Sequence, residues 1–301
     1  MNKIASKQGV SMSLTLDMSR IDSALEGFTI PPRPDMLKQV QEEVEKDEPN
    51  LKAISQYINQ DIGIAGFTLK VVNSPLFSLP RKISTIEHAC MFLGLKRLIK
   101  LVNSIVLRFT LSAGSEEIFT EKLWNSSMKI GNASLILAQH FELEKDFSDD
   151  CYTAGLFHNA GMALIFSQSA NYPKLLKQAY LDSAIIGEFE EANFDTSHEV
   201  LGFLIAQSWG LNSEISNVIA YHHSPNIMLA TGEASEQQMF AILKLAEHMT
   251  NSTEILTGVN PDNEWEKFST QILDVLHLED FQLLDLGETL FNAGIDNIYH
   301  V

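Results

Sequence analysis

The sequence lacks the features that would place it in a membrane or outside the cell. It has no run of about 18 or more apolar residues, so we expect no membrane-spanning helix, and polar residues interrupt the first 20 positions, where a signal peptide needs an apolar core. Its two cysteines, Cys90 and Cys151, lie among apolar neighbours. We therefore expect buried free thiols rather than a disulfide or a thiolate metal site, in a cytoplasmic protein.

Basic residues are also scarce: 21 Lys and Arg stand against 39 Asp and Glu, for a net charge of −18. Such a field repels phosphate backbones and anionic lipids, so neither nucleic acid nor a membrane surface is expected as a partner. Residues 81–108 are the exception, with Glu87 as the only acid among Arg81, Lys82, Lys96, Arg97, Lys100 and Arg108. We favour a solvated face, or a surface that packs on acidic parts of the same chain, over an anion or partner site.

Few stretches alternate as strands do, whereas long stretches repeat apolar residues at helical spacing. The sequence therefore predicts an all-α protein, and its 301 residues suffice for one large core or two packed subdomains. We expect a weakly ordered lead-in over residues 1–27, an N-terminal helical subdomain over 28–114, and a second helical subdomain over 115–301. The segment "SAGSEE" at 112–117 marks the boundary between the two.

Side chains that accept hydrogen bonds from backbone amides predict where several helices begin. Single caps are predicted at Asn50, Asp61 and Ser148, and capping boxes are predicted for Ser84 with Glu87 and for Thr196 with Glu199.

Histidines are concentrated in the second half, where His158, His198 and the pair His222 and His223 lie on separate predicted helices, with Glu247 further on. Helical spacing places His158 on an apolar face, so it is expected to point inward. A single histidine on such a face is commonly a hydrogen-bonded core residue. Helical bundles also build metal sites from inward side chains on facing helices, so the set points to such a site more strongly than any one member.

Several ordered motifs carry a family resemblance over about residues 28–225. They are "IPPRPDML", "INQDIGIAGFTLKVVNSPLF" and "ISTIEHACMFLGLKRL" in the first half, then "LWNSSM", "AGLFHNAGMALI", "SHEVLGFLIAQSWGL" and "VIAYHHSP". This span resembles an HDOD module, a signalling-associated relative of the HD superfamily of metal-dependent phosphohydrolases. The resemblance implies an HD-type helical bundle with an N-terminal helical subdomain packed on it, placed in bacterial signalling and usually without demonstrated catalysis.

The resemblance also implies which positions would hold metal in an active relative. The early histidine falls at Ser126, and the His-Asp pair becomes His158 and Asn159. His198 and one of His222 or His223 match the later histidines, and Glu247 matches the final acid. An amide cannot bridge two metals or act as a base as a carboxylate does, so we expect a vestigial site with no metal or cofactor. The alternative is Fe, Mn or Zn held by His158, His198, His222, His223 and Glu247.

Three functions follow from these patterns. The first is a non-catalytic signalling module acting through protein contacts, with cyclic-di-nucleotide enzymes, kinases or response regulators as the implied partners and "NSPLFSLP" and "SAGSEE" as candidate hinges. The alternative is a metal-dependent phosphohydrolase acting on a small phosphate ester or nucleotide. A third hypothesis is a sensor whose emptied site binds a small ligand such as a nucleotide, with the basic segment 81–108 neutralising its phosphate. No oligomeric state is predicted.

Overall fold

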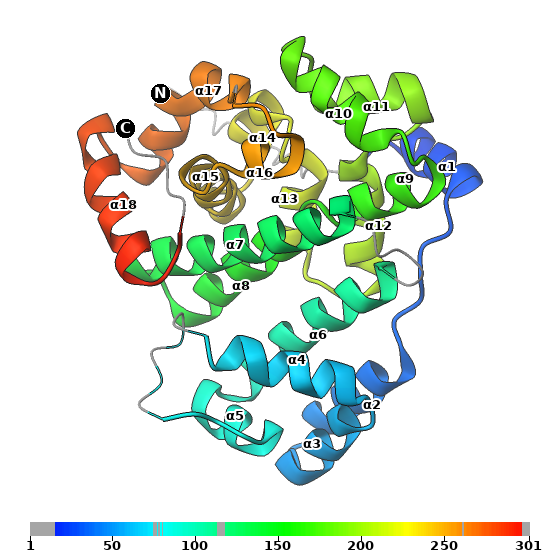
Figure 1. Cartoon of the computed structure of the whole chain (residues 1–301), viewed down its shortest axis with the longest axis vertical. Coiled ribbons are helices and arrows are strands. Elements are labelled where there is room, and N and C mark those ends of the chain that lie inside the picture. The colour runs from blue at the N-terminus through cyan, green and yellow to red at the C-terminus, as the bar shows by residue number, and fades with distance from the viewer. Residues whose placement is uncertain are drawn as a thin grey trace, which may run out of the picture.

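The computed structural model describes residues 16–74, 77, 79, 81–112, 118–260 and 262–296. These residues fold into helices joined by turns, and no strand occurs among them, which confirms the all-α prediction (Figure 1). Within the same ranges, no helix combines the length and the apolar character needed to span a bilayer. Cys90 and Cys151 are buried free thiols, as predicted.

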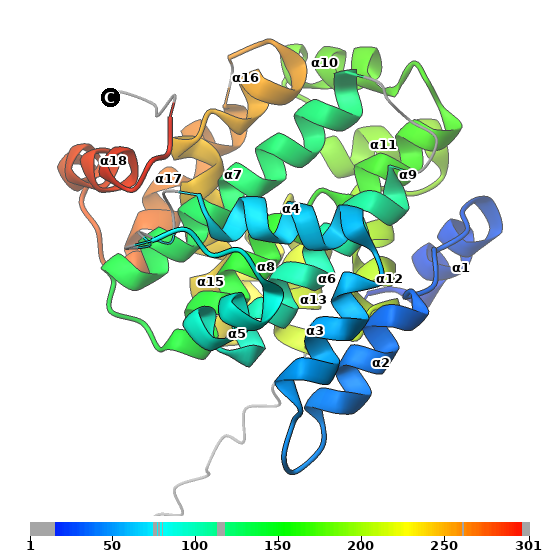
Figure 2. The same ribbon diagram turned by 60° about the horizontal axis from the view of Figure 1, so that its bottom comes forward.

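The first group of helices lies in the lower part of Figure 1 and comprises α2 (Asp35–Val44), α3 (Leu51–Asn59), α4 (Ile62–Val72), α5 (Ile86–Leu93) and α6 (Leu95–Leu111). Figure 2 looks toward this group and shows α2 and α3 lying side by side. Asn50 and Asp61 cap α3 and α4 as predicted, each accepting hydrogen bonds from backbone amides of the first turn. The predicted capping box at Ser84 is wrong, because Thr85 is the cap and its Oγ1 accepts from the His88 amide at 3.1 Å.

The second group forms the upper part of Figure 1. It comprises α7 (Ile118–His140), α8 (Lys145–Phe157), α9 (Ala160–Gln168), α10 (Tyr172–Leu181), α11 (Ile186–Phe194), α12 (His198–Ser208), α13 (Ser213–Tyr221), α14 (Pro225–Thr231), α15 (Ala234–Met249), α16 (Ser252–Thr257), α17 (Asn263–Leu276), η2 (Asp280–Gln282) and α18 (Leu283–Asn292). The long helix α7 packs along α8, and α15 packs against both. This arrangement encloses the core in which the predicted histidines lie.

Two predicted helix starts in this group are wrong. α8 begins at Lys145, so Ser148 lies inside the helix and its hydroxyl donates back to the Glu144 carbonyl at 3.0 Å. α12 is capped by Ser197, whose Oγ accepts from the Val200 amide, rather than by Thr196. Glu199 does not reach back to close a capping box, because its carboxylate accepts a hydrogen bond from the His223 amide at 3.2 Å.

The two groups meet where α6 packs on α8, and ion pairs join these helices. Lys96 Nζ lies 2.8 Å from Asp146 Oδ2, and Arg97 Nε lies 2.6 Å from Asp149 Oδ1. Lys100 pairs with Asp150 at the same interface. Half of the basic residues of segment 81–108 are therefore engaged by acids of the same chain, in the intrachain packing that the sequence favoured. Arg81 and Lys82 instead line a hollow beside the end of α4.

The helix α1 (Met18–Gly27) was missed by the sequence, which predicted a weakly ordered lead-in as far as residue 27. Asp17 caps this helix by accepting from the Ser19 amide at 2.9 Å, and Arg20 pairs with Glu191 across to α11. α1 packs on α12, after which the chain runs extended through residues 28–34 down to α2 (Figure 1). Residues 1–15, most of the candidate hinge at 112–117 and half of the one at 73–80 lie outside the described residues.

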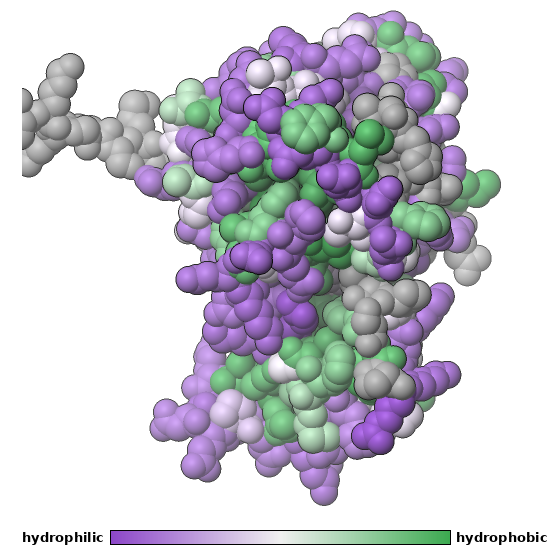
Figure 3. Space-filling view, turned by 90° about the vertical axis from the view of Figure 1, so that its left-hand side faces the viewer, coloured by the Kyte–Doolittle hydropathy of each residue, from purple (hydrophilic) through white to green (hydrophobic). Residues whose placement is uncertain are grey.

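The C-terminal end of the chain exposes apolar side chains. Phe281, Leu284 and Phe291, on η2 and α18, are all exposed large hydrophobic residues. The face of the molecule on that side shows apolar patches among mostly polar residues (Figure 3). Apolar and aromatic side chains in such surroundings are the material of protein interfaces.

The end of α7 predicts a stabilising substitution. Glu142 has a φ of +56°, and it sits in a cap where the Leu143 amide donates to the Ala138 carbonyl at 3.1 Å. This left-handed backbone conformation favours glycine, because in any other residue the Cβ lies too close to the following carbonyl oxygen. We expect Glu142→Gly to raise the free energy of unfolding by about 0.5–1 kcal/mol, measured by chemical denaturation. Glu144→Gly, at a φ of −54°, should bring no such gain.

Candidate functional site

Close approaches of helix backbones at glycines bring the predicted site residues together. α9 crosses α12 at Gly161, where an added Cβ would lie 2.1 Å from the carbonyl oxygen of His198. α7 crosses α8 at Gly131 and Gly155, where a Cβ on Gly155 would lie 2.7 Å from the Gly131 Cα. Larger side chains would separate these helices. The glycines therefore set the position of His158, at the turn between α8 and α9, relative to the start of α12.

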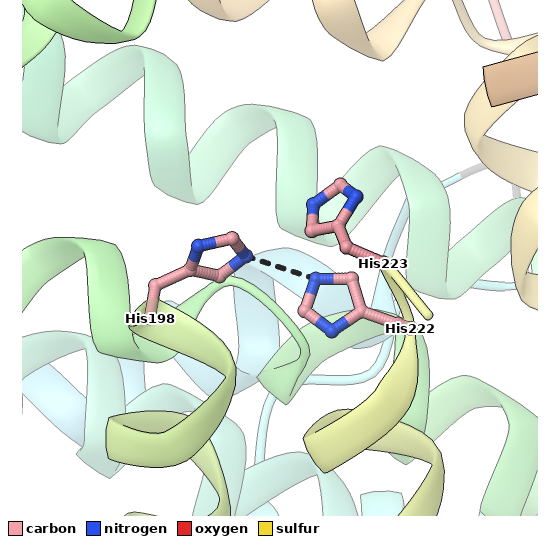
Figure 4. A group of neighbouring side chains, drawn as sticks. All are labelled: His198, His222 and His223. Carbon is pink, nitrogen blue, oxygen red and sulfur yellow. Dashed lines mark hydrogen bonds between the residues drawn. The ribbon is translucent and has the colours of Figure 1, made fainter. Parts of the chain in front are cut away.

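Four histidines converge from three parts of the chain. The Nε2 atoms of His198 and His222 lie 3.0 Å apart, and His223 lies beside both (Figure 4). One ring nitrogen from each of these three lies within 4.8 Å of the other two. The ring of His158 meets that of His222 edge-on, with centroids 5.3 Å apart. His158, His198 and His222 are completely buried, whereas the side chain of His223 is 7% exposed.

Each histidine is oriented by an acceptor at Nδ1. The pairs are His158 with the Gly155 carbonyl at 2.7 Å, His198 with Glu190 at 2.6 Å, His222 with the Ile219 carbonyl at 2.7 Å and His223 with Glu264 at 2.9 Å. We assign a proton to Nδ1 in every case, because these partners can only accept. In a neutral ring, Nε2 then carries a lone pair. Metal-binding histidines are oriented in the same way.

A buried lysine beside the histidines was missed by the sequence. Lys244, on α15, is only 5% exposed, and its Nζ lies 2.7 Å from Glu247 Oε2 and 3.0 Å from Glu264 Oε2. Burial alone would lower the pKa of Lys244, but the two carboxylates outweigh it and hold that pKa well above its usual range. In the sequence, Lys244 and Glu247 form an i, i+3 pair within a largely apolar helix. Lys-Glu pairs at this spacing are more often exposed to solvent, so the pair did not indicate a buried site.

The lysine also fixes the charge of its partners. Burial would raise the pKa of Glu247, but the Lys244 ammonium holds it well below its usual range. Glu247 Oε1 lies 3.2 Å from His158 Nε2, an electrostatic contact that lacks hydrogen-bond geometry. Burial lowers the pKa of His158 despite this contact, so the ring is neutral at neutral pH. The result is a buried ammonium between two carboxylates, facing neutral imidazole.

A buried hydrogen-bond chain supports the other side of the cluster, and the sequence missed its first two members. The Tyr172 hydroxyl donates to Glu190, which accepts from both the backbone amide and the ring of His198. Burial would raise the pKa of Glu190, but His198 and Tyr172 hold it below its usual value. Beyond His198 lies His222, and a hydrogen bond across the 3.0 Å between their Nε2 atoms requires a proton on one of these two atoms. These bonds fix the orientation of the His198 ring. A fixed ring orientation is expected both of a metal ligand and of a structural core residue.

The structure brings together five of the seven predicted site residues through direct contacts: His158, His198, His222, His223 and Glu247. Asn159 follows His158 in the chain, and both it and Ser126 are buried. Neither the Ser126 hydroxyl nor Asn159 Oδ1 has a hydrogen-bond partner among the described residues. Ser126 and Asn159 therefore place polar atoms in the interior and supply neither a carboxylate nor an imidazole.

Comparison with known proteins identifies the family. The model of the HDOD domain matches residues 30–225, well over half of the chain. The chain belongs to the HDOD family. An uncharacterized protein from Treponema pallidum is 28% identical to this HDOD chain over 202 residues, which cover 65% of the chain and 38% of that protein. YuxH, an uncharacterized protein from Bacillus subtilis, is 38% identical over 52 residues, or 17% of the chain and 13% of that protein.

Solved structures share the HDOD fold. An HDOD domain protein of unknown function from Geobacter sulfurreducens superposes with a TM-score of 0.63 at 20% identity, covering 92% of this chain and 98% of that one. A candidate phosphohydrolase from Shewanella amazonensis gives 0.63 at 19% identity, covering 91% and 96%. A candidate signal transduction protein from Marinobacter aquaeolei gives 0.56 at 17% identity, covering 95% and 63%. At these identities the likeness establishes the fold alone.

Proposed function

We propose that this HDOD protein is a non-catalytic signalling module that acts through protein contacts in the bacterial cytoplasm. The observation that carries the proposal is the Lys244 ammonium between Glu247 and Glu264. A buried pair of carboxylates needs a positive charge nearby, and here a side chain supplies it. The acid that would hold a metal ion in an active relative is thereby already neutralised.

The remaining donors support the same conclusion. Hydrolysis by a metal-bound water needs anionic oxygen to hold the ion and a base to take the proton. Asn159 and Ser126 supply neither, and Glu247 has its pKa held too low to act as a base near neutral pH. Access to the cluster is limited to His223, because the other three histidines are completely buried. The arrangement is that of a structural polar core rather than a reaction centre.

The partner classes that we propose are those implied by the family: cyclic-di-nucleotide enzymes, kinases or response regulators. Support for a signalling role comes from the shared fold of the Marinobacter aquaeolei protein, which is itself named only as a candidate signal transduction protein. The exposed Phe281, Leu284 and Phe291 offer apolar surface of the kind that protein contacts use.

Metal analysis and hydrolysis assays test the proposal together. Protein purified without added ions is expected to contain Fe, Mn and Zn far below one equivalent, and to leave nucleotides and small phosphate esters intact with or without added Mn²⁺. Stoichiometric metal together with hydrolysis that disappears in His158→Ala would overturn the proposal in favour of a phosphohydrolase.

A second candidate function, metal binding without hydrolysis, is favoured by one specific observation. His198, His222 and His223 each have Nδ1 held by an acceptor, which leaves Nε2 as the ring nitrogen available to a metal ion, and one ring nitrogen of each lies within 4.8 Å of the other two. Three such imidazoles are a donor set that suits Zn²⁺ or Fe²⁺. The buried Lys244 ammonium opposes metal binding at this site, because its positive charge would repel a metal cation beside His222.

The two candidates differ in how metal content responds to mutation. If the three histidines bind metal, His222→Ala should lose it, whereas His140→Ala, a change at an exposed histidine at the end of α7, should retain it. Metal retained in both variants would exclude the three-histidine site.

A further inference from the structure

A cavity of about 270 Å³ opens beside the histidine cluster. Its walls come from the α10–α11 connection, α14 and the first half of α17. Tyr180, His223 and Glu264 line this cavity and also a smaller hollow of about 30 Å³, which is lined by Lys244 and Glu247. The larger cavity is just below the size range of drug-sized sites, roughly 300–1,000 Å³, so it suits a small molecule. Its inner end adjoins the buried charges.

The mouth of the cavity leaves apolar surface in contact with water. Ile185 is 51% exposed and Ile227 is 46% exposed, and both line the cavity. Ile186 and Phe268, which are buried, continue the apolar wall inward. A ligand with an apolar body would remove this surface from water, which is the main favourable contribution in pockets of this kind.

The charged residues that line the cavity determine which polar group a ligand can carry. Glu264 lies at the inner end with 25% of its side chain exposed, and Glu188 lies at the rim. Lys267 is the only lysine or arginine among the lining residues, and its Nζ lies 5.1 Å from the centre of the Phe268 ring. With the net charge of −18, this lining disfavours anions such as phosphates and favours a cationic or N–H-donating group.

The backbone at the cavity is strained on one side. Ser183 has a φ of +53° in the α10–α11 connection, where the Ala184 amide donates to the Ala179 carbonyl at 3.0 Å. This is a helix end at which glycine is usual, and a serine there stores strain. Such residues gather at ligand clamps and switch regions. Ser183 and Ile185 both line the cavity, so this strained turn forms part of its wall.

We propose that this cavity binds a small molecule with an apolar body and a cationic or N–H-donating nitrogen group directed at Glu264. Amines, amidines and amino-substituted heterocycles belong to this class. The role of such a ligand as an input signal rests on the proposed signalling function, but its binding does not. Lys244 and His223 both contact Oε2 of Glu264, whereas Oε1 has no hydrogen-bond partner among the described residues, so a donor at Oε1 would share the carboxylate with the buried ion pairs.

Paired probes of similar shape test the charge preference. Benzamidine and 2-aminobenzimidazole carry N–H groups on a flat apolar body, whereas benzoate matches benzamidine in shape with the opposite charge. At about ten times the dissociation constant, either N–H probe should raise the melting temperature by about 2–5 °C, while benzoate should not. Shifts of the His223 and Ile227 signals in NMR spectra should accompany binding.

Matched variants locate the site. Ile227→Arg puts a cation at the mouth and should weaken binding of the N–H probes at least tenfold. Ile62→Arg makes the same change at a position on α4 that is 86% exposed and does not line the cavity, and should leave binding unchanged. The proposal fails if no N–H probe binds, if benzoate binds as well as benzamidine, or if Ile227→Arg binds normally. None of these results bears on the metal analysis that tests the signalling function.

Discussion

Lys244→Met is expected to lower the free energy of unfolding by about 3–5 kcal/mol, because it removes one member of a buried ion-pair cluster. Methionine matches the length of the lysine stem, so the packing of α15 changes little. What changes is that Glu247 and Glu264 lose the ammonium lying 2.7 and 3.0 Å from their oxygens. An unpaired carboxylate destabilises the folded state far more when it is buried than when it is exposed to water. Equilibrium denaturation in urea at pH 7.5 measures the loss.

The pH dependence of this loss identifies its cause. In the native protein the pKa values of Glu247 and Glu264 are held low, so their stabilising contribution is present above the unfolded carboxyl pKa and is lost as the pH falls. Without Lys244, burial should raise both pKa values above those of the unfolded chain, and protonation should then favour the folded variant. The difference between the two proteins should therefore narrow from pH 8 to pH 5.

Lys38→Met provides the matched control, since Lys38 forms an exposed pair with Asp35 at 2.9 Å. We expect it to change the free energy of unfolding by less than about 0.5 kcal/mol. A Lys244→Met protein as stable as the control, or one whose deficit stays constant with pH, would show that the ammonium does not neutralise the buried acids.

Gly161→Ala is the second substitution with a large expected effect. Its Cβ would lie 2.1 Å from the His198 carbonyl oxygen and 2.8 Å from the carbonyl carbon, both of which are backbone atoms. Neither can rotate away, so α9 and α12 must separate. Overpacking of this kind costs about 3 kcal/mol or somewhat more. The separation should also lengthen the 3.0 Å contact between His198 and His222 by moving the start of α12.

Thermal unfolding and the NMR signals of the histidine rings measure these two consequences of Gly161→Ala. Gly66→Ala is the control, because no atom outside the neighbouring residues and backbone of α4 lies within 4 Å of its Cβ position. In that open helix site alanine should stabilise by about 0.5–1 kcal/mol. If Gly161→Ala unfolds like the native protein and leaves the ring signals in place, the close crossing does not position the histidines.

Local patterns predicted most of the helices but not all their ends. Asn50 and Asp61 were identified correctly because each is a lone acceptor ahead of an amphipathic run. Ser84 and Thr196 were chosen over Thr85 and Ser197 because neighbouring hydroxyl residues can cap equally well in sequence terms. Which of the two adjacent residues caps the helix depends on the backbone conformation of the segment that leads into it, and tertiary packing sets that conformation.

The histidines of the site and Glu247 could be predicted, whereas its other charged residues could not. Histidines on apolar helix faces are unusual enough to be noticed, and the family resemblance placed them together. Lys244, Glu190 and Glu264 look like ordinary surface residues of charged helices. Their burial depends on which helices pack against α15 and α12, so no local pattern reveals it.

The position of α1 limits how the molecule can be divided. Arg20 pairs with Glu191, the Gly27 carbonyl accepts from Gln168, and the Pro31 carbonyl accepts from Trp209. α1 thus belongs spatially to the last two-thirds of the polypeptide, while α2–α5 lie apart from it. Cleavage near residue 112 would leave two fragments held together by the contacts of α1 with α12 and of α6 with α8. Expressed separately, the C-terminal fragment would present a bare face on α12 and would need α1 grafted onto it to be covered.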